Sequence, residues 1–291
     1  MRFGMHLPQW GSIATRDGVL GIARVAEEVG FHSVWVGDHV AWPARWESSY
    51  PFAAAPPVTP DQGFLEAFTV LAAVAGATER VRLGIGALVL PLRHPLMVAK
   101  VAATLDVVSG GRAELALGAG WLREEFEVLG EPFDGRGARF DAAIDLLRHA
   151  WAHGHVEGSG PEYHFDEAII RPLPAQSGGP PLLIAGMTRA AFRRAASLGD
   201  GWYAVGAKVE ELSDGRAQIE AERQRLGRTG PFTVATVIRL DPDRERLRHR
   251  LGALAEAGVD KVVFGTFGDD LNKLSAAVED FGTHVLPDLT D

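Results

Sequence analysis

An aspartate and a histidine stand side by side directly after an apolar run, as Asp38 and His39. A carboxylate and an imidazole at the end of a strand can transfer protons or steady a group that accepts a hydride. A capping aspartate followed by a packing histidine would give the same two residues. The pair therefore indicates chemistry only if the elements around it build a site.

Three small residues, Gly118, Ala119 and Gly120, follow another apolar run. Small residues at the end of a strand let the backbone approach a flat ligand closely. A tight turn would use the same residues. The segment is therefore a candidate cofactor contact, with a simple turn as the alternative.

A second candidate cofactor contact comprises Gly186, Met187, Thr188 and Arg189, at the expected passage from a strand to a helix. Backbone N–H groups at the start of that helix, together with the Thr188 hydroxyl, could bind a phosphate. Arg189 could add a positive charge. An ordinary helix cap is the alternative interpretation.

Tryptophans recur around these positions, and Trp42, Trp46 and Trp121 could either pack in a core or form a wall against a ring ligand. Trp42 and Trp121 are assigned to the substrate pocket. His6 and Trp202 join them because they fall at or near expected strand ends.

Other polar groups are interpreted as structural. Three glutamates in one short segment, Glu124, Glu125 and Glu127, are expected on a solvated helix face. Four histidines gather in one part of the chain, but their spacing matches no defined ligand set, so we expect no metal site. They are His149, His153, His155 and His164.

The elements that must position these groups form a regular alternation. Eight short apolar runs alternate with helical segments, which predicts an α/β fold with a parallel sheet covered by helices. Eight such units favour a closed (β/α)8 barrel over an open doubly wound sheet, because no glycine-rich dinucleotide fingerprint follows the first strand. The expected strands are 2–8, 31–36, 81–88, 112–117, 181–185, 200–205, 232–238 and 261–265.

We expect residues 1–291 to form a single barrel domain with two insertions. Residues 41–63 follow the second strand, are rich in proline, alanine and aromatic residues, and would cover the site as a lid. Residues 152–179 precede the fifth strand and should carry a small hairpin around Val156 and 163–165.

Composition excludes several classes of protein. The 291 residues include no cysteine, so thiolate catalysis, disulfides and iron–sulfur clusters are absent, which fits a cytoplasmic protein. A formal net charge of −9 argues against nucleic acid or an anionic membrane as a partner. No apolar run of about 18 residues occurs that would span a bilayer.

Taken together, these segments resemble the luciferase-like monooxygenase superfamily, most closely its branch of oxidoreductases that use the deazaflavin coenzyme F420. The resemblance covers nearly the whole chain. Its segments are MRFGMHLP, AEEVGFHSVWVGDH, ERVRLGIGALVLPLRHP, LDVVSGGRAELALGAGWLREEF and PLLIAGMTRAAFRRAASLGDGW.

The resemblance implies a (β/α)8 barrel with the cofactor ring over the carboxyl ends of the strands. It implies that His39 lies near the reacting face of the ring, with Asp38 as its neighbour in the motif. Gly86 and Ala87 match a strand position that often carries a non-prolyl cis peptide behind the ring.

By the same resemblance, the turn from Gly186 to Arg189 holds the cofactor's phosphate, and Gly118 to Gly120 pack along the ring. One position departs from the family's sugar-phosphate dehydrogenases, where a glutamate follows the strand-four Gly-x-Gly. Here that position is Trp121. The departure argues against a proton donor at this position and against a sugar-phosphate substrate, and it favours a flat or apolar one.

The sequence therefore predicts an oxidoreductase that transfers a hydride between coenzyme F420 and a small organic substrate. His39 would donate or accept the proton, oriented by Asp38 or by the backbone. One alternative is an FMN-dependent monooxygenase that uses reduced flavin and oxygen with a separate flavin or F420 reductase. A non-catalytic carrier or sensor of the same cofactors is another. We also expect a homodimer.

Overall fold

The barrel consists of eight parallel strands. The structure, a computed structural model, describes residues 1–51, 55–56, 58–59, 61–266 and 268–289. The barrel strands are β1 (Arg2–His6), β2 (Ser33–Val36), β3 (Arg82–Val89), β4 (Ala113–Gly118), β7 (Leu182–Ala185), β8 (Gly201–Val205), β9 (Thr233–Arg239) and β10 (Lys261–Gly265). They pair in the order β1, β10, β9, β8, β7, β4, β3, β2, and β2 returns to β1. The expected (β/α)8 barrel is confirmed, and the open-sheet alternative is wrong.

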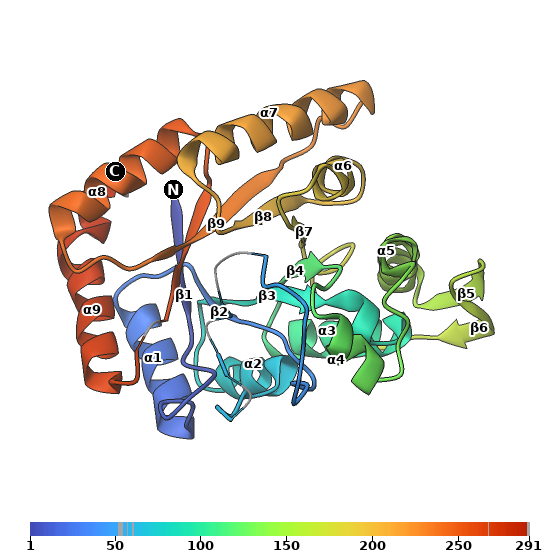
Figure 1. Cartoon of the computed structure of the whole chain (residues 1–291), viewed down its shortest axis with the longest axis horizontal. Coiled ribbons are helices and arrows are strands. Elements are labelled where there is room, and N and C mark those ends of the chain that lie inside the picture. The colour runs from blue at the N-terminus through green and yellow to red at the C-terminus, as the bar shows by residue number, and fades with distance from the viewer. Residues whose placement is uncertain (52–54, 57, 60, 267, 290–291) are drawn as a thin grey trace.

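Helices cover the outside of this barrel (Figure 1). They are α1 (Arg16–Glu28), α2 (Ala67–Ala75), α3 (Pro95–Val108), α4 (Arg123–Val128), α5 (Arg136–His153), α6 (Arg189–Ser197), α7 (Val209–Arg225), α8 (Arg244–Glu256) and α9 (Leu271–His284), with short 3-10 turns η1 (Leu90–Leu92) and η2 (Leu286–Leu289). In the described part of the chain, no helix is both long enough and apolar enough to cross a bilayer.

Helix α2 is absent from the sequence-based expectation. Its nine residues, AFTVLAAVA, contain no charge, so no polar face reveals a helical period. The Glu66 side chain starts it by accepting hydrogen bonds from the backbone N–H groups of Phe68 and Thr69. A short helix that is apolar all round cannot be told from a buried strand by its sequence.

The insertion before β7 forms the expected hairpin. Strands β5 (His155–Ser159) and β6 (His164–Ile169) pair antiparallel and stand apart from the barrel, beyond α5 in Figure 1. The Tyr163 and Phe165 rings of this insertion pack against His94, which follows η1.

Two large rings fill the barrel interior. Trp35 and Tyr203 are fully buried and stacked, with ring centroids 5.3 Å apart. Glycines make this possible, because a Cβ on Gly84 would lie 2.3 Å from a Trp35 ring atom and one on Gly86 would lie 2.5 Å from the Tyr203 hydroxyl oxygen. The interior is thus packed solid below the strand ends.

His6 lies in the same interior. Its Nε2 atom is 3.3 Å from the Tyr203 hydroxyl, and its Nδ1 atom is buried without a hydrogen-bond partner among the described residues. Burial lowers the pKa of His6 to about 4 and raises the pKa of Tyr203. Both side chains are therefore neutral near pH 7.

Gly84→Ala tests the close packing around Trp35. The added methyl group overlaps the indole ring, so we expect the free energy of unfolding to fall by about 2 kcal/mol or more in urea titrations. Gly21→Ala is the matched control, because nothing lies within 4 Å of its added Cβ in α1 and it should gain roughly 0.5–1 kcal/mol. Equal stability of the two variants would contradict the packing argument.

His6→Gln tests the buried neutral imidazole. The unfolded chain binds a proton at this position near pH 6.5 and the folded chain only near pH 4, so wild-type stability is lost as the pH falls through this window. Between pH 7.5 and pH 5, the variant should lose roughly 2 kcal/mol less stability than the wild type. Burial also lowers the pKa of His32 to about 4, but His32 is present in both proteins, so its contribution cancels in the comparison. Parallel losses would show that His6 does not carry the effect.

Candidate functional site

His39 lies in an aromatic enclosure formed by Trp42, Phe64 and Trp121. The ring centroids are 4.3, 5.7 and 6.2 Å from that of His39, each at a steep angle. His39 follows β2, Trp42 and Phe64 belong to the loop after β2, and Trp121 follows β4. The enclosure therefore sits at the carboxyl ends of the strands, where barrels of this kind place their sites. Phe64 is a residue that the sequence reasoning missed.

The His39 imidazole is held by Glu125, from α4. Its Nδ1 atom lies 2.8 Å from Glu125 Oε2, and the other carboxylate oxygen accepts backbone N–H groups from Val40 at 2.7 Å and Ala41 at 3.2 Å. The Glu125 side chain is 2% exposed, whereas His39 is 16% exposed. His39 Nε2 has no hydrogen-bond partner in the described part of the chain, so one ring nitrogen is fixed and the other is free to act.

This arrangement corrects the expectation that Glu125 belongs to a solvated helix face. The adjacent Phe126 is also buried, so the helix turns both residues toward the protein. A run of three glutamates in six residues hides this, because composition does not say which one faces inward. Glu125 and Glu127 both adjoin Phe126, so adjacency to an apolar residue does not distinguish the buried glutamate from the exposed one.

Asp38 does not orient His39, contrary to one expectation. Its carboxylate binds the Arg93 guanidinium through two contacts of 2.7 Å and accepts the Val89 N–H at 2.9 Å. Burial opposes the charge on Arg93, but Asp38 outweighs it and raises the pKa of the guanidinium. Asp38 therefore ties the end of β2 to the turn after β3, and Arg93 is the partner that sequence reasoning missed.

The loop over residues 41–63 is anchored on both sides of the site. Glu124 accepts backbone N–H groups from Glu47 at 2.8 Å and Ser48 at 3.2 Å. The Gln9 side chain joins the two ends of the loop, because it bonds to Gly37 before the loop and to the Leu65 carbonyl oxygen after it. Positions 52–54, 57 and 60 of this loop lie outside the described residues.

The barrel mouth beside His39 has a small-residue, apolar floor. Four partly exposed side chains at strand ends pack on the buried cluster that contains Trp35 and Tyr203; they are Ala87, Ala185, Val205 and Val237. Gly118 ends β4, and a Cβ there would meet Ala87 Cβ at an ordinary 3.5 Å. Packing therefore does not require glycine at Gly118, and its missing side chain leaves space at the mouth.

A buried hydrogen-bond donor without an acceptor also indicates a ligand site. The Trp42 Nε1–H group is buried and meets no acceptor among the described residues, and buried donors are normally satisfied. Together, the free donor, the space at Gly118 and the apolar floor fit a flat ring with polar edges. Flavins and deazaflavins have this shape and chemistry.

Two predicted ring contacts have another physical reason to be glycine. Gly86 accommodates Tyr203, and a Cβ on Gly120 would lie 2.6 Å from a Phe126 ring atom. Ala119 is partly exposed at the mouth beside them. The Gly86–Ala87 peptide is cis, as the resemblance implies. Of these residues, Ala87 packs on the interior cluster of Trp35 and Tyr203, whereas Ala119 packs on the larger core cluster.

The turn before α6 is a capped helix start. Gly186 has a φ of +124°, which favours glycine, and the Thr188 hydroxyl accepts the Ala191 N–H at 3.2 Å. Thr188 and Arg189 are exposed, and Met187 packs partly against the core. The cap alternative is thus realised, and the exposed turn stays available to an anion.

Trp202 is not part of the substrate pocket, which corrects its assignment. It is fully buried on the outer side of β8, where it packs against Phe192 of α6 and against Gly215 of α7. Its Nε1 donates to the Gly186 carbonyl oxygen at 2.8 Å. Successive strand residues point to opposite faces, so Tyr203 takes the inward position and Trp202 the outward one. His6, also assigned to the substrate pocket, is instead buried beside Tyr203 in the barrel interior.

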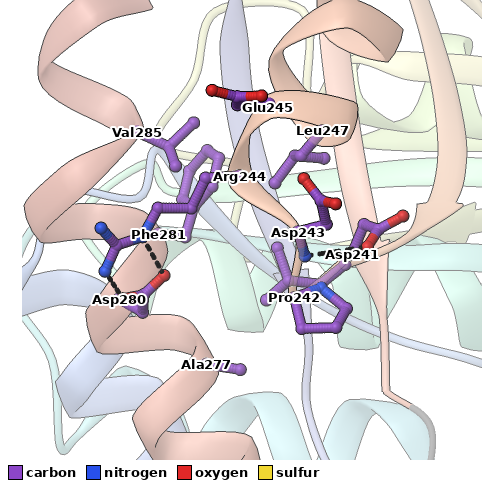
Figure 2. A pocket seen from close by; sticks show the side chains of 11 residues that line it. Asp241, Pro242, Asp243, Arg244, Glu245, Leu247, Ala277, Asp280, Phe281 and Val285 are labelled. Atoms are coloured by element: carbon purple, nitrogen blue, oxygen red, sulfur yellow. Dashed lines mark hydrogen bonds and ion pairs between the residues drawn. The ribbon is translucent and has the colours of Figure 1, made fainter.

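Two hollows on the surface do not include His39 or its aromatic enclosure. Figure 2 shows one between the start of α8 and α9, where Arg244 pairs with Asp280. Asp241 there is paired with Arg246. A second hollow lies beside the β5–β6 hairpin. Its histidines cluster with ring centroids 4.5–6.0 Å apart, and no group in the described ranges could hold a metal ion.

Comparison with known proteins finds relatives over most of the chain. A Mycobacterium tuberculosis protein, uncharacterized protein Rv0940c, is 33% identical over 270 residues, covering 88% of this chain and 89% of that one. An F420-dependent glucose-6-phosphate dehydrogenase from Beutenbergia cavernae is 34% identical over 261 residues, 86% of this chain and 72% of that one. An FMNH(2)-dependent dimethylsulfone monooxygenase from Pseudomonas putida is 28% identical, over 73% of this chain and 59% of that one.

A solved structure has the same fold. An F420-dependent secondary alcohol dehydrogenase, in complex with an F420-acetone adduct, superposes with a TM-score of 0.81 at 21% identity, covering all of this chain and 99% of that one. The family model for luciferase-like monooxygenases matches residues 1–281. With its closed barrel and its site at the strand ends, the chain belongs to the luciferase-like monooxygenase family.

Proposed function

We propose that this protein transfers a hydride between coenzyme F420 and a small, neutral organic substrate. The observation that carries the proposal is His39: a buried carboxylate fixes one ring nitrogen, and the other has no partner in the described part of the chain. The apolar floor lies at the same end of the barrel. An imidazole held in this way serves proton transfer, and the floor suits a planar ring.

The residues then take distinct roles. The cofactor supplies a ring carbon that accepts or donates the hydride. His39 Nε2 takes the proton from a substrate hydroxyl, or returns it to a carbonyl in the reverse direction. Trp42, Phe64 and Trp121 exclude water around the imidazole, and Ala87, Ala119 and Gly118 would lie against the ring. The exposed turn from Gly186 to Arg189 would hold the phosphate.

The preference for a neutral substrate rests on the enclosure. Its walls are aromatic, and the nearby Arg93 is already held by both Asp38 oxygens. A phosphate group would have to break that pair. Although the Beutenbergia relative is named for glucose-6-phosphate, the Trp121 side chain here lies against His39 and Tyr50. An alcohol or a ketone with an apolar body suits these walls better.

We further propose that the protein works in a reducing cytoplasm, as a homodimer, beside a separate reductase that regenerates the cofactor. The absence of cysteine supports the compartment. An FMN-dependent monooxygenase is the second candidate function, because the name of the Pseudomonas relative specifies reduced FMN.

Parallel titration with F420 and FMN, oxidised and reduced, tests the cofactor by fluorescence. We expect F420 to bind with micromolar or tighter affinity and FMN much more weakly. Gly118→Ala is the matched variant: its Cβ would meet Ala87 Cβ at an ordinary 3.5 Å but take up space at the mouth, so the melting temperature should hold while F420 binding falls several-fold. Selective binding of reduced FMN with oxygen uptake would establish the monooxygenase instead. Tight binding without turnover of any alcohol or ketone would favour a carrier.

His39→Asn tests the proton-transfer role. Asparagine can still donate toward Glu125 but lacks the Nε2 nitrogen, so turnover with F420 should fall roughly 10²-fold or more. The dissociation constant of F420 should change less than threefold, because the floor is intact. Steady-state kinetics and fluorescence titration measure the two effects. Wild-type turnover in this variant would remove His39 from the mechanism.

A further inference from the structure

We infer that Glu125 is a positioning residue that fixes the His39 tautomer, so that Nε2 is the nitrogen that exchanges protons with the substrate. The substrate step rests on the proposed function. The tautomer itself rests on contacts within this chain and can be tested without any cofactor.

The donor and acceptor types determine the direction of the hydrogen bond. An ionised carboxylate accepts hydrogen bonds and cannot donate them. Glu125 Oε1 already accepts the backbone N–H groups of Val40 and Ala41, and these cannot be reversed. The 2.8 Å contact of Oε2 therefore requires a proton on His39 Nδ1.

A proton fixed on Nδ1 leaves the lone pair of the neutral imidazole on Nε2. That nitrogen has no partner among the described residues and belongs to a ring that is 16% exposed. With oxidised F420 bound as the proposed hydride acceptor, the substrate C–H bond would break and its hydride would pass to the cofactor. The substrate O–H proton would move to Nε2, and the C–O bond would become C=O. The imidazolium that results lies against the Glu125 carboxylate, which stabilises its charge.

The neighbouring glutamate shows that Glu125 does more than anchor the loop. Glu124 accepts two backbone N–H groups of the same loop, at Glu47 and Ser48, but does not touch His39. The two residues share a helix, a charge and a type of contact. They differ in the bond to the imidazole, which makes Glu124 a matched control.

Nitrogen-15 NMR of histidine-labelled protein tests the inference. Chemical shifts and couplings of the two ring nitrogens distinguish the tautomers, and the His39→Asn spectrum assigns the His39 signals. We expect the Nδ1–H form in the wild type and in Glu124→Gln. In Glu125→Gln, the single amide oxygen can accept the backbone N–H groups, which turns the amide NH2 group toward His39 Nδ1. An NH2 donor pairs with an unprotonated Nδ1, so the Nε2–H form should appear.

Kinetics provide the second measurement. Glu125→Gln should lower kcat with F420 by roughly 10²-fold and leave the F420 dissociation constant within threefold, while Glu124→Gln should act mainly on the substrate KM. Glu125→Asp keeps the charge on a shorter side chain and should recover part of the lost kcat. If the glutamine variant fails to fold, Glu125→Asp is the variant in which kcat is measured.

Two results would overturn the inference. One is an unchanged Nδ1–H tautomer in a folded Glu125→Gln variant, and the other is an equal change of tautomer in Glu124→Gln. A failure of the proposed function has a different signature. In that case the tautomer would respond to Glu125 as expected, while His39→Asn kept its turnover or F420 failed to bind.

Discussion

The stacked pair of Trp35 and Tyr203 is the constraint on which the site depends. Two rings of this size fill the barrel up to the strand ends, and they fit only because Gly84 and Gly86 have no side chains. The strand-end residues above them rest on a surface that cannot collapse. A ligand at the mouth therefore meets a rigid floor, which lowers the cost of organising the site when it binds.

Above this floor, each polar group has its own partner and its own role. Asp38 and Arg93 neutralise each other and join β2 to the turn after β3. Glu125 serves His39, and Gln9 fastens both ends of the loop to β1 and β2. Each buried charge thus has a partner, as burial requires. The imidazole is left with a single free nitrogen in an otherwise apolar surrounding.

The sequence predicts the barrel well because its evidence is periodic and repeated. Eight apolar runs that alternate with helical segments locate the strands to within one or two residues, and β10 matches Lys261–Gly265 fully. Helix α2 escapes because it has no polar face. Errors in the site have a different origin. Whether Trp202 points inward and which glutamate of α4 is buried depend on strand register and helix phase, and residue type does not reveal either.

Pairings between distant segments are the other limit. Arg93 meets Asp38 across 55 positions of chain, and Glu125 meets His39 across 86. Neither bond follows from local spacing, because barrel closure brings the partners together. Adjacent Asp38 and His39 suggested a dyad, whereas the fold gives each residue a partner of its own.

The anchors of the loop after β2 have a consequence for how this scaffold can change. Glu124 and Glu125 hold the loop through the main-chain N–H groups of Val40, Ala41, Glu47 and Ser48, and the Ser48 hydroxyl also accepts the Arg123 N–H. The path of residues 40–48 thus depends more on α4 than on most of the side chains of this segment. Side chains on it can be exchanged to accept new substrates while the imidazole stays in register, so one barrel can support many specificities.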